Sequence, residues 1–247
     1  MDKNLMPPWN FLIISDTEES FDAIGVAHLN NLKDNLHLKK HENVLEIGSG
    51  NGRIACALST YLTDGNYVGV DVMKPFTQWC NKTYNQYSNF SFKHINVYNK
   101  KYNPDGKLSD VDYIFDFQDD SLDLIYLTSV FTHMLHLGVE NYIKEIYRML
   151  KPGGRCMITY FLINEETKTL MNKGKYGLKF VEYAHPTYST NLIIPEVAVA
   201  YDEQYIIDLY AAAGFDITKI EVSYGTWRDA PNANKIGFWQ DRIAIYK

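Results

Sequence analysis

Residues 44–53 of this 247-residue chain read VLEIGSGNGR. The apolar run 44–47 predicts a short buried strand, and the alternating glycines Gly48, Gly50 and Gly52 predict a turn into a helix. Glycine is needed where backbone comes close to a ligand, and a helix N-terminus offers free N–H groups to that ligand. The stretch therefore predicts a strand, a ligand-binding loop and a helix in direct succession.

Two carboxylates flank this loop. Asp71 ends the next expected strand, 19 residues after Gly52, where a carboxylate can accept both hydroxyls of an adenosine ribose. Glu46 stands two residues before the first glycine and is expected to face the ligand. A dinucleotide site would direct a pyrophosphate to this turn, and a nearby carboxylate would repel it. The carboxylate and the GxGxG spacing therefore favour a cationic amino-acid ligand over a dinucleotide.

Strands and helices alternate along the rest of the chain. Helices are expected in 17–38, 52–62, 139–150 and 202–213, with another starting near Pro75. Strands are expected in 67–70, 90–97, 122–128 and 155–161, with later candidates at 215–224 and 242–246. The motif KPGG at 151–154 is expected to stop a helix and turn into the fifth strand. This alternation predicts a parallel, doubly wound α/β sheet.

Composition narrows the class of protein. The chain has a net charge of −6 and is 46% hydrophobic, which is typical of globular proteins. Its cysteines, Cys56, Cys80 and Cys156, lack CxxC spacing, so a cytoplasmic location is the simplest expectation. The basic dyads are isolated, whereas a nucleic-acid site would form a basic stripe. No run approaches the ~18 apolar residues of a membrane span, so neither a nucleic acid nor a membrane is an expected partner.

The chain resembles the class I S-adenosylmethionine-dependent methyltransferases. Four stretches carry the resemblance in the family's order and spacing: VLEIGSGNGR (44–53), VGVDV (68–72), DDSLDLIYLTSVFTHM (119–134) and EIYRMLKPGGRCMITYF (145–161). The resemblance implies S-adenosylmethionine as cofactor and one domain over residues 1–247. It also implies a Rossmann-like, seven-stranded, mostly parallel sheet with an antiparallel last strand and helices on both faces.

The resemblance also implies which residues bind the cofactor. In the family the first loop holds the methionine part, the acidic residue after the second strand holds the ribose, and the end of the third strand contacts the adenine. The matching positions are Glu46, Gly48, Ser49, Gly50, Gly52, Asp71, Val72, Asn96 and Val97. Ser129, after the fourth strand, completes the expected cofactor-binding set. Many relatives have Asp where Asn96 stands, although the Asn carbonyl can still accept a hydrogen bond from the adenine amino group.

The sulfonium of such a cofactor already activates the methyl group, so catalysis chiefly needs an aligned nucleophile and a dry site. A hydroxyl nucleophile must also lose its proton to a base. His133 follows the fourth strand and is the candidate base, because imidazole titrates near neutral pH. The alternative is that His133 only packs or hydrogen-bonds within its loop. His136 lies three residues on without a further carboxylate, so no metal is expected.

The acceptor is to be sought in the parts that are least typical of the family. Residues 162–201 break the alternation of strands and helices and are expected to form a substrate lid. Residues 1–40 are expected to form an N-terminal helical cover. Tyr183, His185 and Arg228 are the candidate substrate contacts. Aromatic faces and polar edges suit a sugar, although structural packing explains the tyrosines equally well. Arginine suits a phosphate or carboxylate, although a surface position explains Arg228 equally well.

A late Gly-x-Trp…Gln-Asp signature (Gly225, Trp227, Gln240 and Asp241) is similar to that of small-molecule or glycan-cluster methyltransferases. The sequence therefore predicts O-methylation of a small molecule such as a sugar or sugar derivative of surface-glycan biosynthesis. A small-molecule N-methyltransferase, a non-catalytic S-adenosylmethionine-binding module and a nicotinamide oxidoreductase are the alternatives. A homodimer stays open, and the acceptor atom and pathway are not set by the sequence.

Overall fold

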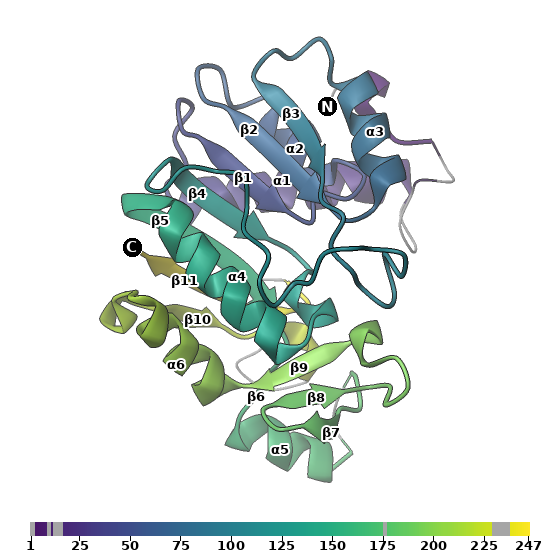
Figure 1. Ribbon diagram of the computed structural model, residues 1–247, viewed down its shortest axis with the longest axis vertical. Helices are drawn as coiled ribbons and strands as arrows, with labels where there is room; N and C mark the ends of the chain where they lie inside the picture. The colour runs from purple at the N-terminus through teal and green to yellow at the C-terminus, as the bar shows by residue number, and fades with distance from the viewer. Residues whose placement is uncertain (1–2, 9–10, 12–16, 175–176, 229–237) are drawn as a thin grey trace. The chain divides into compact units, whose positions relative to one another are not determined.

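The computed structural model describes residues 3–8, 11, 17–174, 177–228 and 238–247 (Figure 1). Within these residues the larger sheet has seven strands: β1 (Val44–Ile47), β2 (Tyr67–Asp71), β3 (Phe90–His94), β4 (Leu122–Leu127), β5 (Leu150–Tyr160), β10 (Glu221–Ser223) and β11 (Asp241–Tyr246). Their order is β10-β11-β5-β4-β1-β2-β3. Strands β1, β2 and β3 are parallel, and β11 is antiparallel to β5 and β10. The predicted Rossmann-like sheet with an antiparallel last strand is confirmed.

The chain divides into two compact units, residues 1–96 with 122–126 and residues 97–121 with 127–247. The first unit holds the short 3-10 helix η1 (Lys3–Leu5) and the helices α1 (Glu18–Asp34), α2 (Arg53–Leu58) and α3 (Lys74–Thr83). Helix α1 packs on α2, and α3 packs on β2 and β3. The side chain of Thr17 caps α1 by accepting from the N–H of Ser20, and Pro75 lies in the first turn of α3.

The second unit contains α4 (His136–Met149) and α6 (Glu203–Ala213), which lie side by side (Figure 1). Asp202 caps the start of α6, and Gly214, with φ of 106°, ends it. The prediction that residues 151–154 form a turn before the strand was wrong, because they belong to β5. Gly153 N–H donates to the carbonyl of Lys247 at 3.0 Å, so the end of the chain pairs with this stretch.

Residues 162–202 form a small sheet of their own in the second unit. Its strand order is β6-β9-β8-β7, with bounds β6 (Leu162–Ile163), β7 (Val181–Ala184), β8 (Thr187–Ser189) and β9 (Val199–Asp202). Helix α5 (Glu165–Asn172) and the 3-10 helix η4 (Pro195–Val197) complete this segment. Phe161, Phe180 and Trp227 are buried together beneath it. The predicted break in the α/β alternation is therefore an ordered subdomain and not an irregular loop.

The predicted strand 215–224 is shorter than expected. Residues Ile217–Lys219 form the 3-10 helix η5, since the side chain of Asp216 accepts from Thr218 N–H and caps it, and only Glu221–Ser223 pairs in the sheet. Two further 3-10 helices are η3 (Phe131–His133) and η6 (Thr226–Arg228). No helix in the described ranges is long and apolar enough to span a membrane.

Candidate active site

The loop between β1 and α2 has a backbone conformation that favours glycine. Gly48, Gly50 and Gly52 have φ of 82°, 51° and 79°, in the left-handed region where a side chain is strained. The N–H groups of Gly48 and Ser49 donate to the carbonyl of Val70 at 2.7 and 3.1 Å, which fixes the loop against β2. The GxGxG spacing found in the sequence thus corresponds to three backbone positions that glycine adopts without strain.

Asp71 is buried at the end of β2 and holds this loop in place. One carboxylate oxygen accepts from Gly50 N–H and the other from Met73 N–H, both at 2.7 Å. Burial raises the pKa of Asp71, and these backbone donors oppose that rise by stabilising the ionised form. Each oxygen keeps a second lone pair, so Asp71 can still accept ribose hydroxyls. Val72 follows, and its carbonyl lies 3.1 Å from Nε2 of His94.

Glu46 is a buried acid next to the loop, with 3% of its surface exposed. It accepts a short hydrogen bond from the hydroxyl of Tyr67 on β2. Burial raises the pKa of Glu46 to about 8, against the lowering effects of the Tyr67 hydrogen bond and the charge of Arg53. The charge of Asp71 contributes to this rise. Glu46 therefore carries a proton at neutral pH.

Ser49 has a buried hydroxyl with no hydrogen-bond partner in the part of the chain that the structure describes. A side chain on Gly69 would place its Cβ 2.9 Å from this oxygen, so Gly69 leaves room for it. A buried polar atom of this kind is one that a ligand or water completes. Together with the glycine backbone, the buried acid Glu46 and the carboxylate of Asp71, it fits an adenosyl amino acid, the cofactor that the sequence predicts.

The N-terminal segment reaches the same loop. The side-chain amide of Asn51, between Gly50 and Gly52, donates to the carbonyl of Phe11 at 2.9 Å. The ring of Phe11 lies 5.4 Å from that of Phe76 and 6.2 Å from that of Trp79, both on α3. Part of the predicted cover, residues 1–40, thus contacts the cofactor loop; residues 1–2, 9–10 and 12–16 lie outside the described residues.

The predicted adenine contacts lie where β3 ends. Asn96 is half-buried there, and Val97 is buried as the first residue of the second unit. The carbonyl of Val97 accepts from the side-chain amide of Asn103 at 2.9 Å. The contact of Asn96 and Val97 with an adenine stays a prediction.

In the second unit, Ser129 has φ of 58°, the left-handed conformation that residues other than glycine seldom adopt. Its N–H donates to the hydroxyl of Thr159 at 2.8 Å, and its exposed side chain donates to the carbonyl oxygen of the Gln240 amide at 3.0 Å. Strained backbone of this kind clusters at functional sites. The part of Ser129 in cofactor binding stays a prediction, and Gln240 is its immediate neighbour.

His133 ends η3, and both of its ring nitrogens have partners. Nδ1 lies 2.8 Å from the carbonyl oxygen of Glu196, which can only accept, so Nδ1 carries the proton. Nε2 is left as an acceptor, 3.3 Å from the hydroxyl of Tyr102. Burial is the main influence that lowers the pKa of His133 to about 4. The imidazole is therefore neutral near pH 7, with its lone pair on Nε2.

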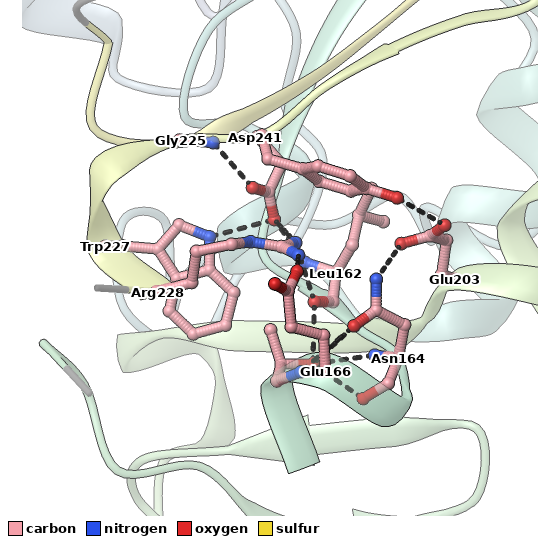
Figure 2. A network of polar contacts seen from close by, with 10 residues as sticks. Leu162, Asn164, Glu166, Glu203, Gly225, Trp227, Arg228 and Asp241 are labelled. Carbon is pink, nitrogen blue, oxygen red and sulfur yellow. Dashed lines mark hydrogen bonds and ion pairs between the residues drawn. The ribbon is translucent and has the colours of Figure 1, made fainter. Parts of the chain in front are cut away.

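Arg228 lies in a buried polar network and not on the surface (Figure 2). Its Nη2 donates to the carboxylate of Asp241 at 2.9 Å and to the carbonyl of Leu162 at 3.2 Å. Asp241 also accepts from Gly225 N–H, Trp227 Nε1 and Leu162 N–H, each at 2.8 Å. Three residues of the late sequence signature, Gly225, Trp227 and Asp241, thus belong to one hydrogen-bonded unit.

A further carboxylate, that of Glu166, lies near the guanidinium of Arg228, and Glu203 belongs to the same polar network (Figure 2). Glu166 lies 3.8 Å from Nη1, and Glu203 accepts from Asn164 at 2.8 Å and from Tyr224 at 3.0 Å. The carboxylates of Asp241 and Glu166 thus lie near one cation, which disfavours an anionic ligand. The network supports a structural role, and contact of Arg228 with an anionic acceptor stays a prediction.

The other predicted acceptor contacts, Tyr183 and His185, are exposed on β7 and directly after it. His136 lies apart from them in the chain, with Nδ1 3.1 Å from the hydroxyl of Thr187. Across the described ranges, no three His, Cys, Asp or Glu side chains gather where they could hold a metal ion.

Comparisons with known proteins show similarity to methyltransferases. Residues 45–158 match the family model described as "Methyltransferase domain". A curated protein of Invertebrate iridescent virus 6, "Putative methyltransferase 235L", is 25% identical over 162 residues, which are 63% of this chain and 52% of that protein. The chain thus spans about half the length of this relative.

Solved structures share the fold. The PH0226 protein of Pyrococcus horikoshii has a TM-score of 0.60 at 16% identity, over 94% of this chain and 92% of its own. The 1,6-didemethyltoxoflavin-N1-methyltransferase of Burkholderia thailandensis, solved with S-adenosylhomocysteine, has a TM-score of 0.56 at 15% identity, over 93% and 79% of the two chains.

The fold, the glycine loop and the matching family model define a methyltransferase domain. The family match over residues 45–158 and the shared fold support the class I S-adenosylmethionine-dependent methyltransferase that the sequence predicts. S-adenosylmethionine is accordingly its cofactor. Glu46, Ser49 and Asp71 are the side chains that fit it in the first unit.

Three neighbours of predicted site residues were missed from the sequence: Tyr67 beside Glu46, and Tyr102 and Glu196 beside His133. The first pair is 21 residues apart, and the others are 31 and 63 residues apart. Tyr67 starts the strand next to the glycine loop, which is the only sequence signal that could have singled it out.

Proposed function

We propose that this protein transfers the methyl group of S-adenosylmethionine to an oxygen atom of a small molecule, with a sugar or sugar derivative as the favoured acceptor. The observation that carries the proposal is the loop Gly48–Gly52, held by Asp71 beside the buried acid Glu46. When bound, the cofactor supplies a methyl group that its sulfonium has already activated. The chain's own residues then have to position the acceptor, exclude water and accept a proton.

His133 is proposed as the base that takes the acceptor's hydroxyl proton. Its Nδ1–H is held by the carbonyl of Glu196, which keeps the lone pair on Nε2. Tyr102 lies next to Nε2 and Asn99 donates to the carbonyl of His133 at 2.8 Å, so the ring and its loop are held in place. A positioned neutral imidazole is the form that general-base catalysis uses.

The acceptor is proposed to be a small molecule because the acidic chain lacks a basic stripe in its sequence. The subdomain formed by residues 162–201 is proposed to contact it, with the exposed Tyr183 and His185 offering an aromatic face and a polar edge. Action in the cytoplasm is part of this proposal, and a homodimer is compatible with it.

Replacing His133 by alanine is expected to lower the rate of methyl transfer by roughly 100- to 10,000-fold, the usual range for loss of a general base. Affinity for S-adenosylhomocysteine should change by less than about twofold, because Glu46 and Asp71 are untouched. Single-turnover rates with labelled S-adenosylmethionine and calorimetric titration measure the two effects. His133→Gln serves as the matched control that keeps a polar group without a base.

The pH profile adds a second readout. Because the pKa of His133 is about 4, protonation should block its lone pair only at acid pH. The rate at saturating cofactor should therefore stay flat between about pH 6 and 8 and fall as pH drops through the pKa. Unchanged transfer in His133→Ala would exclude the base, and a product methylated on nitrogen, identified by mass spectrometry, would exclude an oxygen acceptor.

A further inference from the structure

The buried pair formed by Glu46 and Tyr67 has a property that cofactor recognition alone does not require. Glu46 lies on β1, and its partner across the parallel ladder is Gly69, two residues after Tyr67. Positions 67 and 69 share one face of β2, and Glu46 projects from the same face of the neighbouring strand. The tyrosine hydroxyl reaches the carboxyl group of Glu46 along this face.

No cation contacts Glu46 within the described part of the chain. The titratable groups around it are Tyr67 and Asp71 on β2, Arg53 on α2, Cys80 on α3, and Tyr84 directly after α3. Arg53 acts on it only through its charge, and Asp71 opposes that effect. A carboxyl group buried to this degree, with one hydroxyl donor, favours its neutral form.

A cationic ligand changes this balance. A positive charge close to a buried carboxyl stabilises the ionised form strongly, because the surroundings screen it little. The hydroxyl of Tyr67 can donate to a neutral carboxyl but donates more strongly to a carboxylate, so it stabilises the charged form without rearrangement. Burial thus favours the proton on Glu46, and a bound cation would favour its loss.

We propose that Glu46 is neutral in the free protein, that it releases its proton to solvent when the cationic cofactor binds, and that Tyr67 is the positioning residue whose hydroxyl stabilises the resulting carboxylate. The inference rests on the proposed function, since it takes S-adenosylmethionine as the cation. One proton leaves Glu46 for the buffer, and no covalent bond of the cofactor changes. Affinity for S-adenosylmethionine then rises with pH, approaching tenfold per pH unit below the pKa of the free protein's Glu46.

The test is calorimetric titration with S-adenosylmethionine at pH 7 in two buffers of different ionisation enthalpy. The wild-type protein is expected to release roughly 0.9 proton per cofactor bound, the fraction of a group with a pKa near 8 that is protonated at pH 7. The same titration with 5′-methylthioadenosine, a neutral thioether lacking the amino acid, should release none.

Two variants separate Glu46 from other groups. Glu46→Gln should bind with no proton release beyond that of the ligand and with affinity independent of pH between 6 and 8. Tyr67→Phe removes the donor to the carboxylate, so the midpoint of the pH dependence should move upward, with affinity recovered at pH 9. Loss of packing alone would lower affinity equally at every pH.

Equal proton release in the wild type and in Glu46→Gln would overturn the inference while leaving the proposed function intact. If Glu46→Gln does not fold by circular dichroism, the wild-type and Tyr67→Phe titrations decide, and an absence of proton release in the wild type overturns it. A protein that binds no S-adenosylmethionine between pH 6 and 9 would overturn the proposed function together with the inference.

Discussion

Replacing Asp241 by alanine is expected to lower the free energy of unfolding by about 3 to 5 kcal/mol, the range measured when one partner of a buried ion pair is removed. The side chains of Asp241 and Arg228 are both fully buried. Without the carboxylate, the guanidinium of Arg228 would stay buried with the carbonyl of Leu162 as its hydrogen-bond acceptor and with Glu166 at 3.8 Å. The rings of Tyr224 and Trp227 also lie against it.

The loss is large because other donors depend on the same group. Gly225 N–H, Leu162 N–H and Trp227 Nε1 all donate to Asp241. Two nitrogens of Arg228, Nε and Nη1, already lack an acceptor in the part of the chain that the structure describes. Each buried donor that is left unpaired adds about 1 to 3 kcal/mol of desolvation cost.

Urea denaturation followed by circular dichroism measures this effect, and tryptophan fluorescence reports on Trp227. Glu182→Ala, which removes an exposed carboxylate from β7, is the control and should leave the unfolding midpoint unchanged. A loss below about 1 kcal/mol in Asp241→Ala would show that the network does not hold the C-terminal segment to Leu162.

Replacing Asp71 by alanine is expected to weaken S-adenosylmethionine binding by about 100-fold, or about 2.7 kcal/mol. The carboxylate fixes Gly50 N–H and Met73 N–H, both at 2.7 Å, and hydrogen bonds to a charged group contribute about 1.5 to 3 kcal/mol each. Loss of both would free the loop and remove the predicted ribose acceptor together.

Asp123→Ala is the matched control for Asp71→Ala. Asp123 also accepts a backbone hydrogen bond, from Asn43 N–H at 2.8 Å. It lies at the start of β4, however, and Asn43 directly precedes β1. This contact is therefore at the opposite end of β1 from Gly48. Affinity should change less than about threefold in this control. Equal losses in both variants would show that Asp71 acts through general stability and not at the cofactor.

The sequence was most informative where a local pattern carries the structure. The glycine loop, Asp71 and the helix α4 could be predicted because their signals lie within a few residues of one another. Strands β6 to β9 could not, since strands of two to four residues show too little periodicity to stand out. The first residues of β5 were assigned to a turn because of the turn preference of Pro152 and Gly153. In the structure, pairing with the end of the chain outweighs that preference.

Contacts between distant residues were also beyond the sequence. Arg228 looked like a surface cation, because nothing near it in the chain reveals the buried carboxylate of Asp241. The spacing of the signature residues in the sequence does not reveal that they hydrogen-bond to one another. Gly225 N–H comes close to Asp241 because β10 and β11 pair in the observed register. The pairing of His133 with Glu196 likewise depends on where η4 lies in the second unit.

Amide chemical-shift mapping of the labelled protein with S-adenosylhomocysteine tests the cofactor site most directly. The largest shifts are expected at Gly48, Ser49, Gly50 and Met73, because the backbone N–H groups of these residues form and fix the loop. In Asp71→Ala the same shifts should require about 100-fold more ligand. Saturable shifts confined to other segments, or none at millimolar ligand, would contradict the assignment of this loop as the cofactor site.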